Sequence, residues 1–478
     1  MESPDVTLEL SVDEMRRLVE QALDYIIPHI ESLPQQPAVN IDEGKAVAQS
    51  LVEPLPEKGQ PFPELLELLF QRAIPTSFNT AGPGYLAYIP GGGLFHSAVA
   101  ELITNAVNRY MGIWLAAPGL AQIEANVLRW FCDLVGYPAS ARGLLTTGGS
   151  LANFSAVVTA RRERLPENFL AGTIYVSDQT HHSVQKAALL AGFPLDNVRA
   201  IPSDSRFRIR VDLLEHRILE DREAERLPFL IVGNAGTTNT GAVDDLPALA
   251  EIARRGRLWF HVDAAYGGCF LLTGHGRTVM KGIEQADSIT LDPHKGLFLP
   301  YGTGSLLVKD GPALKRAHGV SAVYLPSVED DGNLVDFSQM SPELSREFRG
   351  LRVWLPFKMH GVAPFRRNLE EKLQLTQWAT AELRKIPSIE IVAEPQLSIV
   401  AFRLVRPGMD ANALNQLNRQ VLQQINARNR VHLSGTTLNG NFVMRICVLS
   451  FRTHLDRVQM CLEDIKAAVK SVQRRNGE

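Results

Sequence analysis

From about Gly119 onward, short apolar runs rich in β-forming residues alternate with stretches of helical periodicity. This alternation is typical of an α/β domain with a mostly parallel sheet, because parallel strands need a crossover, usually a helix, between them. The predicted strands are residues 173–177, 229–234, 258–265 and 288–291, and residues 305–309 are predicted to follow as an antiparallel strand. The predicted helices include residues 120–135, 183–191, 212–225 and 246–255. In such a sheet the ligand site lies beyond the carboxyl ends of the strands.

The chain has 478 residues, which is too long for one ordinary domain. We predict an N-terminal helical segment (1–85), a large domain (86–370) and a small C-terminal α+β domain (371–478). Ser11 and Glu14 form a capping-box pattern, Pro28 should bend or end the helix that follows, and a second helix is expected at 64–72. In the small domain we expect a long helix, strands near 397–404 and 442–448, and a last helix over 454–472.

The composition narrows the class of protein. The net charge is −3 and no long basic run is present, which argues against binding to nucleic acid or to an anionic membrane. The four cysteines lack CxxC spacing, so neither a zinc site nor a disulfide framework is expected. No apolar run approaches the roughly 18 residues of a membrane span, and the N-terminus lacks an apolar signal core. The expected location is the cytoplasm.

Asp263 and Lys295 each follow an apolar run that is predicted to be a strand. A carboxylate and an amine at the same sheet edge suit pyridoxal phosphate, which needs a lysine for its aldehyde and an acid for its ring nitrogen. Burial beside the cofactor is expected to lower the pKa of Lys295 and make it a nucleophile. Either residue alone has a plainer interpretation, because a strand-end Asp often caps a turn and most lysines are solvated.

Two further motifs lie at predicted strand ends. Gly149 and Ser150 precede a helix, where backbone N–H groups can bind a phosphate, although such a turn is more often plain capping. His181 follows the strand at 173–177 and can stack on a planar ring, or it can simply cap the next helix. Ala265 has a short side chain that leaves room for a flat ring against its strand. The agreement of these motifs, in order along the chain, favours the pyridoxal phosphate hypothesis.

Together these motifs resemble the pyridoxal-phosphate-dependent amino acid decarboxylases of the aromatic-L-amino-acid decarboxylase type, the group II decarboxylases. The segments that carry the resemblance are 147–150 (TGGS), 178–183 (DQTHHS), 236–238 (GTT), 261–266 (HVDAAY) and 292–295 (DPHK). The resemblance covers nearly the whole chain. It implies the pyridoxal-phosphate transferase fold of type I and a homodimer with active sites near the subunit interface.

The resemblance also implies roles for individual residues. Lys295 forms the Schiff base with the cofactor, Asp263 pairs with the ring nitrogen, and His181 stacks on the ring. The other residues implied to contact the cofactor are Gly149, Ser150, Thr238, Ala265, Asp292 and His294, of which Gly149, Ser150 and His294 hold the phosphate.

Three residues are expected to act on the substrate by the same resemblance. Tyr324 matches a loop tyrosine that returns a proton to Cα, Trp114 matches an aromatic position, and Ser345 matches a substrate-discriminating position contributed by the partner subunit. The chain departs from the animal relatives at Asp292, where they carry Asn, and at residues 90–93, which help to shape the substrate pocket. Leu151 stands where many relatives carry an acid.

The predicted reaction is decarboxylation of an L-amino acid, aromatic by the resemblance, to the amine and CO₂. An aldehyde synthase, which couples decarboxylation to oxidative deamination, is the nearest alternative, but it goes with replacement of the loop tyrosine or of the stacking histidine. A decarboxylase of an acidic amino acid such as glutamate, an aminotransferase and a catalytically silent relative are the others. The presence of His181, Tyr324 and Lys295 favours the decarboxylase.

Overall fold

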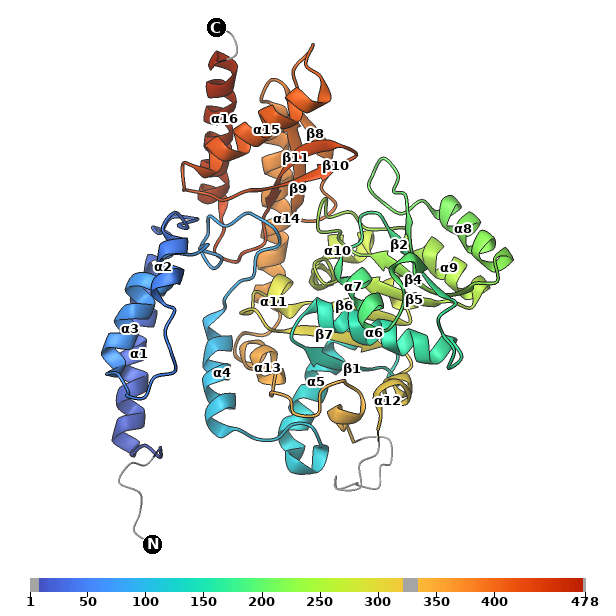
Figure 1. The fold of residues 1–478 in the computed structure, drawn as a ribbon, viewed down its shortest axis with the longest axis horizontal. Coiled ribbons are helices and arrows are strands. Elements are labelled where there is room, and N and C mark those ends of the chain that lie inside the picture. The colour runs from blue at the N-terminus through green and yellow to red at the C-terminus, as the bar shows by residue number, and fades with distance from the viewer. Residues whose placement is uncertain (1–7, 321–333, 476–478) are drawn as a thin grey trace.

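The computed structural model describes residues 8–320 and 334–475. Its large domain is built on a seven-stranded sheet with the order β1-β7-β6-β5-β4-β2-β3 (Figure 1). Only β7 runs antiparallel to its neighbours among these strands. The strands are β1 (Arg142–Thr146), β2 (Gly172–Ser177), β3 (Val198–Ile201), β4 (Leu227–Asn234), β5 (Trp259–Asp263), β6 (Ser288–Leu291) and β7 (Gly304–Val308).

The predicted parallel sheet and its antiparallel strand are confirmed. The prediction missed β1 and β3, which are a short strand beside β7 and a partly exposed strand at the sheet edge. It also extended β5 by two residues, since the strand ends at Asp263 itself. The side chain of Asp263 therefore stands at the carboxyl edge of the sheet.

Helices cover the sheet, and strands β2, β5 and β6 are buried along their whole length. Such continuous burial means that both faces are covered, as in other mostly parallel sheets. Helix α6 packs against β1, β4, β5, β6 and β7. The helices of this domain are α4 (Phe95–Val107), α5 (Pro118–Leu134), α6 (Gly149–Arg164), α7 (Ser183–Leu190), α8 (Val211–Glu223), α9 (Leu246–Gly256), α10 (Gly274–Val279), α11 (Pro293–Gly296), α12 (Pro312–His318) and α13 (Gly350–His360).

The small domain has a four-stranded antiparallel sheet in the order β10-β11-β9-β8. Its strands are β8 (Ile389–Ala393), β9 (Ile399–Leu404), β10 (Ser434–Leu438) and β11 (Asn441–Cys447), and its helices are α14 (Ala363–Arg384), α15 (Ala411–Asn426) and α16 (Leu455–Arg475). Phe402 and Val421 lie in a core of its own. Helix α14 runs across residue 370, and the domain boundaries at 85 and 370 stay predictions.

The N-terminal helices form an arm beside α4 (Figure 1). The arm contains α1 (Val12–Ser32), α2 (Gly44–Ser50), α3 (Phe62–Leu68) and the π-helical turn η1 (Leu69–Ala73). The Ser11 capping box is confirmed, whereas α1 continues past Pro28 for another turn instead of ending there. No residue of α1 is buried. No described helix is long and apolar enough to cross a membrane.

Arg445 of β11 joins the small domain to a loop of the large domain. Its buried guanidinium donates to the carbonyl oxygens of Thr238 and Asn239, the latter at 2.8 Å, and to Ser434 Oγ at 2.9 Å. Burial lowers the pKa of Arg445. These charge-assisted hydrogen bonds hold the loop that follows β4.

We predict that Arg445→Lys lowers the free energy of unfolding by about 2–3 kcal/mol, because an ammonium cannot reproduce the guanidinium's fork of hydrogen bonds. Urea denaturation followed by fluorescence measures the change. Arg403→Lys on the neighbouring strand is the control, since its ion pair with Glu390 is partly solvated and should lose less than about 1 kcal/mol. Equal losses in both variants would contradict a special role for Arg445.

Candidate active site

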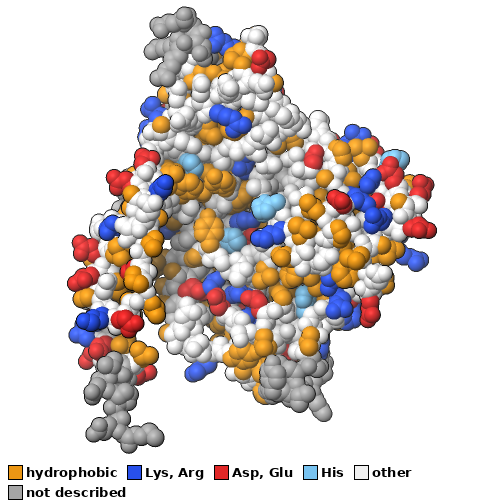
Figure 2. Space-filling model, viewed as in Figure 1, with side chains coloured by type: hydrophobic (Ala, Val, Ile, Leu, Met, Phe, Trp, Pro, Cys, Tyr) orange, Lys and Arg blue, Asp and Glu red, His pale blue; other side chains and the backbone are white. Residues whose placement is uncertain are grey.

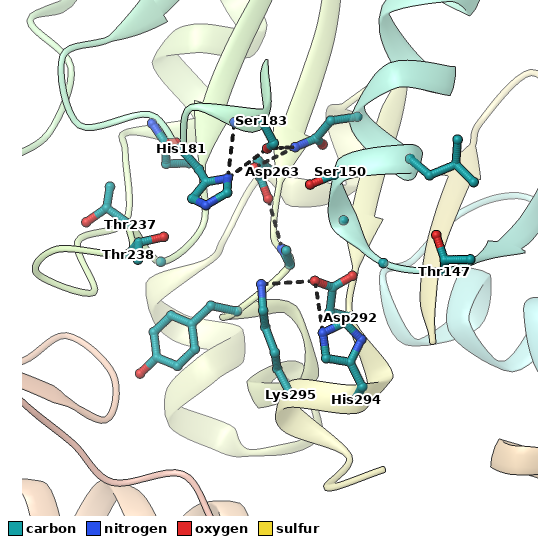
Figure 3. A pocket seen from close by; sticks show the side chains of 18 residues that line it. Thr147, Ser150, His181, Ser183, Thr237, Thr238, Asp263, Asp292, His294 and Lys295 are labelled. Carbon is teal, nitrogen blue, oxygen red and sulfur yellow. Dashed lines mark hydrogen bonds and ion pairs between the residues drawn. The ribbon is translucent and has the colours of Figure 1, made fainter. Parts of the chain in front are cut away.

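A pocket of about 270 Å³ opens at the carboxyl ends of the parallel strands (Figure 3). Each of its polar walls comes from the turn that directly follows a strand, as expected for an α/β sheet. The structure brings all nine predicted cofactor contacts together in its lining: Gly149, Ser150, His181, Thr238, Asp263, Ala265, Asp292, His294 and Lys295.

Gly149 and Ser150 form the first turn of α6 directly after β1. The free N–H groups and the dipole of a helix start suit a phosphate. A Cβ added to Gly149 would lie 3.0 Å from Asp292 Oδ2 and 3.2 Å from Ala265 Cβ, so only glycine leaves this approach open. This wall of the pocket is thus shaped for an anion.

The Asp263 carboxylate is held at both oxygens. Oδ1 accepts from the Ala265 N–H at 3.1 Å, and Oδ2 accepts from Asn153 Nδ2 at 2.9 Å. The residue is 8% exposed and faces the pocket. A buried carboxylate with fixed orientation and open lone pairs can pair with a protonated ring nitrogen.

His181 lies across the pocket wall on the turn between β2 and α7. Its Nδ1 is 2.8 Å from Ser183 Oγ and accepts from the Ser183 N–H at 3.3 Å. Burial lowers the pKa of His181 below its ordinary 6.5, against the opposing effect of the Asp263 carboxylate. A neutral imidazole is therefore the form present near pH 7.

Lys295 Nζ lies 2.9 Å from Asp292 Oδ2. Burial alone would lower the pKa of the Lys295 amine, but the Asp292 carboxylate, with help from Asp263, raises the pKa above its ordinary 10.5. The predicted lowering is therefore wrong for the protein alone, because the sequence does not show how close Asp292 lies. Anything that pairs with or displaces the Asp292 carboxylate would release the amine toward its nucleophilic form.

Asp292 itself is 1% exposed, and its Oδ1 has no hydrogen-bond partner among the described residues. His294 Nε2 lies 3.8 Å from Oδ2, while its Nδ1 donates to the Thr303 carbonyl at 2.6 Å. Burial lowers the pKa of His294. The unpaired oxygen and the imidazole nitrogen both lie beside the helix start that suits a phosphate.

These residues fit pyridoxal phosphate. The glycine-lined helix start suits its phosphate, Asp263 suits its ring nitrogen, and Lys295 suits its aldehyde, as the sequence predicted. The imidazole of His181 and the small Ala265 border the space between them. The carboxylate of Asp292 is the one group that needs a proton or a cation beside a phosphate.

The predicted substrate residues lie elsewhere. Trp114 and Ser345 do not line this pocket: the Trp114 N–H donates to Asp336 Oδ1 at 2.6 Å, and Ser345 is exposed. Tyr324 lies outside the described residues. All three roles stay predictions, and Ser345 was expected to serve the partner subunit.

The sequence interpretation missed two residues that the pocket uses, Asn153 and Ser183. Asn153 follows Ser150 at helical spacing, which would have placed it on the same face of α6. An amide on the buried face of a helix is the signal that points to a partner, but sequence alone does not name that partner.

Comparisons with known proteins agree with this geometry. The model of the pyridoxal-dependent decarboxylase conserved domain matches residues 47–405. An aromatic-L-amino-acid decarboxylase from Bacillus atrophaeus is 35% identical over 97% of both chains, and one from Bos taurus is 29% identical over 98% of this chain and 99% of its own. The crystal structure of Oryza sativa TDC with PLP and tryptamine superposes with a TM-score of 0.93 at 25% identity, covering 98% of this chain and 99% of that one.

We predict that Lys295→Met destabilises the cofactor-free protein by about 3 kcal/mol at pH 8, because it leaves the buried Asp292 carboxylate unpaired. Adding Asp292→Asn should recover most of this loss in urea denaturation. Since folding raises the pKa of Lys295 above 10.5, the stabilisation is fully present below pH 10.5 and is lost as pH rises through the folded value. A Lys295→Met protein as stable as the original would contradict the ion pair.

Proposed function

The chain belongs to the family of pyridoxal-dependent decarboxylases, and we propose that it converts an aromatic L-amino acid to the amine and CO₂. Its cofactor is pyridoxal phosphate, and it is a carboxy-lyase. The observation that carries the proposal is the gathering of Lys295, Asp263 and His181 around one pocket with a glycine-lined helix start. The aromatic substrate is supported by relatives named as aromatic-L-amino-acid decarboxylases, including one 35% identical along nearly the whole chain.

When bound, pyridoxal phosphate supplies a protonated ring that accepts the electron pair released as CO₂ leaves. We propose that Lys295 holds the cofactor through its amine and Asp263 through its ring nitrogen. Gly149, Ser150 and His294 would hold the phosphate, with Asp292 close to it. The Asp263 carboxylate keeps the ring nitrogen protonated, which strengthens the electron sink.

The remaining roles concern the substrate. The neutral imidazole of His181 would cover the ring and Thr238 would lie beside it, while Ala265 leaves room on its own wall. Tyr324 would return a proton to the substrate Cα. Trp114 and Ser345 would meet the side chain of the substrate bound by the partner subunit, where the Ser345 hydroxyl favours a phenolic ring.

We propose that the chain acts as a homodimer. The apolar face of α4 is open to solvent at Leu102 (51% exposed), Ile103 (44%) and Val107 (46%), and α1 buries none of its residues. Figure 2 shows hydrophobic side chains on the walls of the hollow between the N-terminal arm and the large domain. A second copy of the chain would cover both surfaces, as exposed apolar patches of this extent commonly require.

The cytoplasm stays part of the proposal. Cys132, Cys269, Cys447 and Cys461 are all free and buried. Reduced, buried cysteines suit a reducing compartment.

The function is tested by incubating the holoenzyme separately with phenylalanine, tyrosine, tryptophan, DOPA and glutamate. We expect CO₂ and the matching amine in equal amounts from at least one aromatic substrate and none from glutamate. Ammonia and hydrogen peroxide would identify an aldehyde synthase instead, and turnover of glutamate alone would identify an acidic amino acid decarboxylase. Lys295→Ala holoenzyme preparations serve as the inactive control.

For the dimer, we predict that Leu102→Glu combined with Ile103→Glu yields monomers in sedimentation velocity and lowers activity more than tenfold, because charges would be buried at an apolar interface, costing about 2 kcal/mol or more each. Leu219→Glu on α8, also at an exposed apolar residue (56%), should remain a dimer. A monomeric original protein, or a double variant that stays dimeric, would refute this interface.

A further inference from the structure

Asn153 lies in α6, is 1% exposed, and borders the pocket without a role in the proposed chemistry. We infer that Asn153 is a positioning residue that fixes both the orientation of Asp263 and the tautomer of His181. The inference rests on the proposed function only in taking these two residues as the cofactor contacts. The hydrogen bonds that carry it belong to the protein alone.

The Asn153 amide uses all of its hydrogen-bonding capacity. Nδ2 donates to Asp263 Oδ2 at 2.9 Å and to Ser183 Oγ at 2.9 Å. Oδ1 accepts from Thr290 Oγ1 at 2.8 Å and lies 3.1 Å from His261 Nε2. Because the Asp263 carboxylate can only accept, Nδ2 must face it, and the amide has one possible orientation.

The direction of the hydrogen bonds behind Asn153 is fixed as well. Trp259 Nε1–H can only donate, and it donates to Ser288 Oγ at 2.8 Å. The Ser288 hydroxyl is then free to donate to His261 Nδ1, also at 2.8 Å. His261 thus carries its proton on Nε2 and donates it to Asn153 Oδ1. Burial lowers the pKa of His261 to about 4, which keeps the ring neutral.

The same logic passes through Asn153 to His181. Ser183 Oγ accepts from the Asn153 amide, so the Ser183 hydroxyl hydrogen is directed to His181 Nδ1 at 2.8 Å. The Ser183 N–H donates to the same nitrogen. His181 therefore accepts at Nδ1 and carries its single proton on Nε2.

One amide thereby controls two groups of the site. It holds Oδ2 of Asp263, and it sets through Ser183 which nitrogen of His181 is protonated. Without the Asn153 amide, the Ser183 hydroxyl has no fixed donor and Asp263 keeps only the Ala265 N–H. Both changes act on the cofactor contacts and not on the sheet itself.

The test compares Asn153→Leu with Asn418→Leu. Asn418 is also 1% exposed and also makes three amide hydrogen bonds, but to Leu404 and Leu414 in the small domain. Pyridoxal phosphate is titrated into each cofactor-free protein and followed by its visible absorbance. We expect Asn153→Leu to bind about 10- to 100-fold more weakly, the effect of losing one hydrogen bond to a charged group, and Asn418→Leu to bind normally.

The second readout is the tautomer of His181, measured in the cofactor-free protein by ¹⁵N spectra of labelled histidine and assigned with His181→Gln. The original protein should show the proton on Nε2, and Asn153→Leu should show a mixture of the two tautomers. Ser183→Ala should give the same mixture, and adding Asn153→Leu to it should change the tautomer no further. This smaller substitution still decides the histidine arm where Asn153→Leu does not fold.

An unchanged cofactor affinity and an unchanged tautomer in Asn153→Leu would overturn the inference. Equal loss of affinity in Asn418→Leu would also overturn it, because general destabilisation would then account for the effect. If the original protein fails to bind pyridoxal phosphate, the proposed function fails, while the tautomer measurement still tests the network.

Discussion

The parallel pairing of β4, β5 and β6 is the constraint on which the site depends. In this register Asn234 lies opposite Asp263, and Asp263 lies opposite Thr290, so three polar side chains form one row across the sheet. A slip of one residue in β5 would turn Asp263 to the other face and bring Val262 into its place. The hydrogen bonds to Asn153 would then be lost with it, because Asn153 bridges Asp263 and Thr290.

The pocket holds two buried carboxylates, and the protein treats them differently. Both oxygens of Asp263 have donors, so its orientation is set before any ligand arrives. Asp292 instead depends on the flexible ammonium of Lys295 and keeps one oxygen without a hydrogen-bond partner among the described residues. A carboxylate fixed by neutral donors is preorganised, whereas one fixed by a reactive amine must change its partner when that amine reacts.

Much of this arrangement could be predicted from sequence. Strand ends placed Asp263 and Lys295 at one edge, and the glycine-serine motif placed the anion site there too, because the carboxyl ends of parallel strands meet. Boundaries were less accurate: β1 and β3 were missed, and α1 continues through Pro28, since packing and capping outside the local pattern decide where elements end. The pKa of Lys295 was wrong because it depends on a distance that no local pattern encodes.

Helix α6 shows why Asn153 was missed. A helix packed on a sheet normally buries a stripe of large apolar residues, but α6 buries Asn153, Ser155 and Thr159 among its alanines. Small residues let the helix lie close to the strands, and polar ones meet the polar row at the strand ends. The weak contrast between the faces of α6 hides its orientation in the sequence. Yet that weak contrast has a physical cause, because a helix that both covers the sheet and lines the site cannot present a purely apolar face.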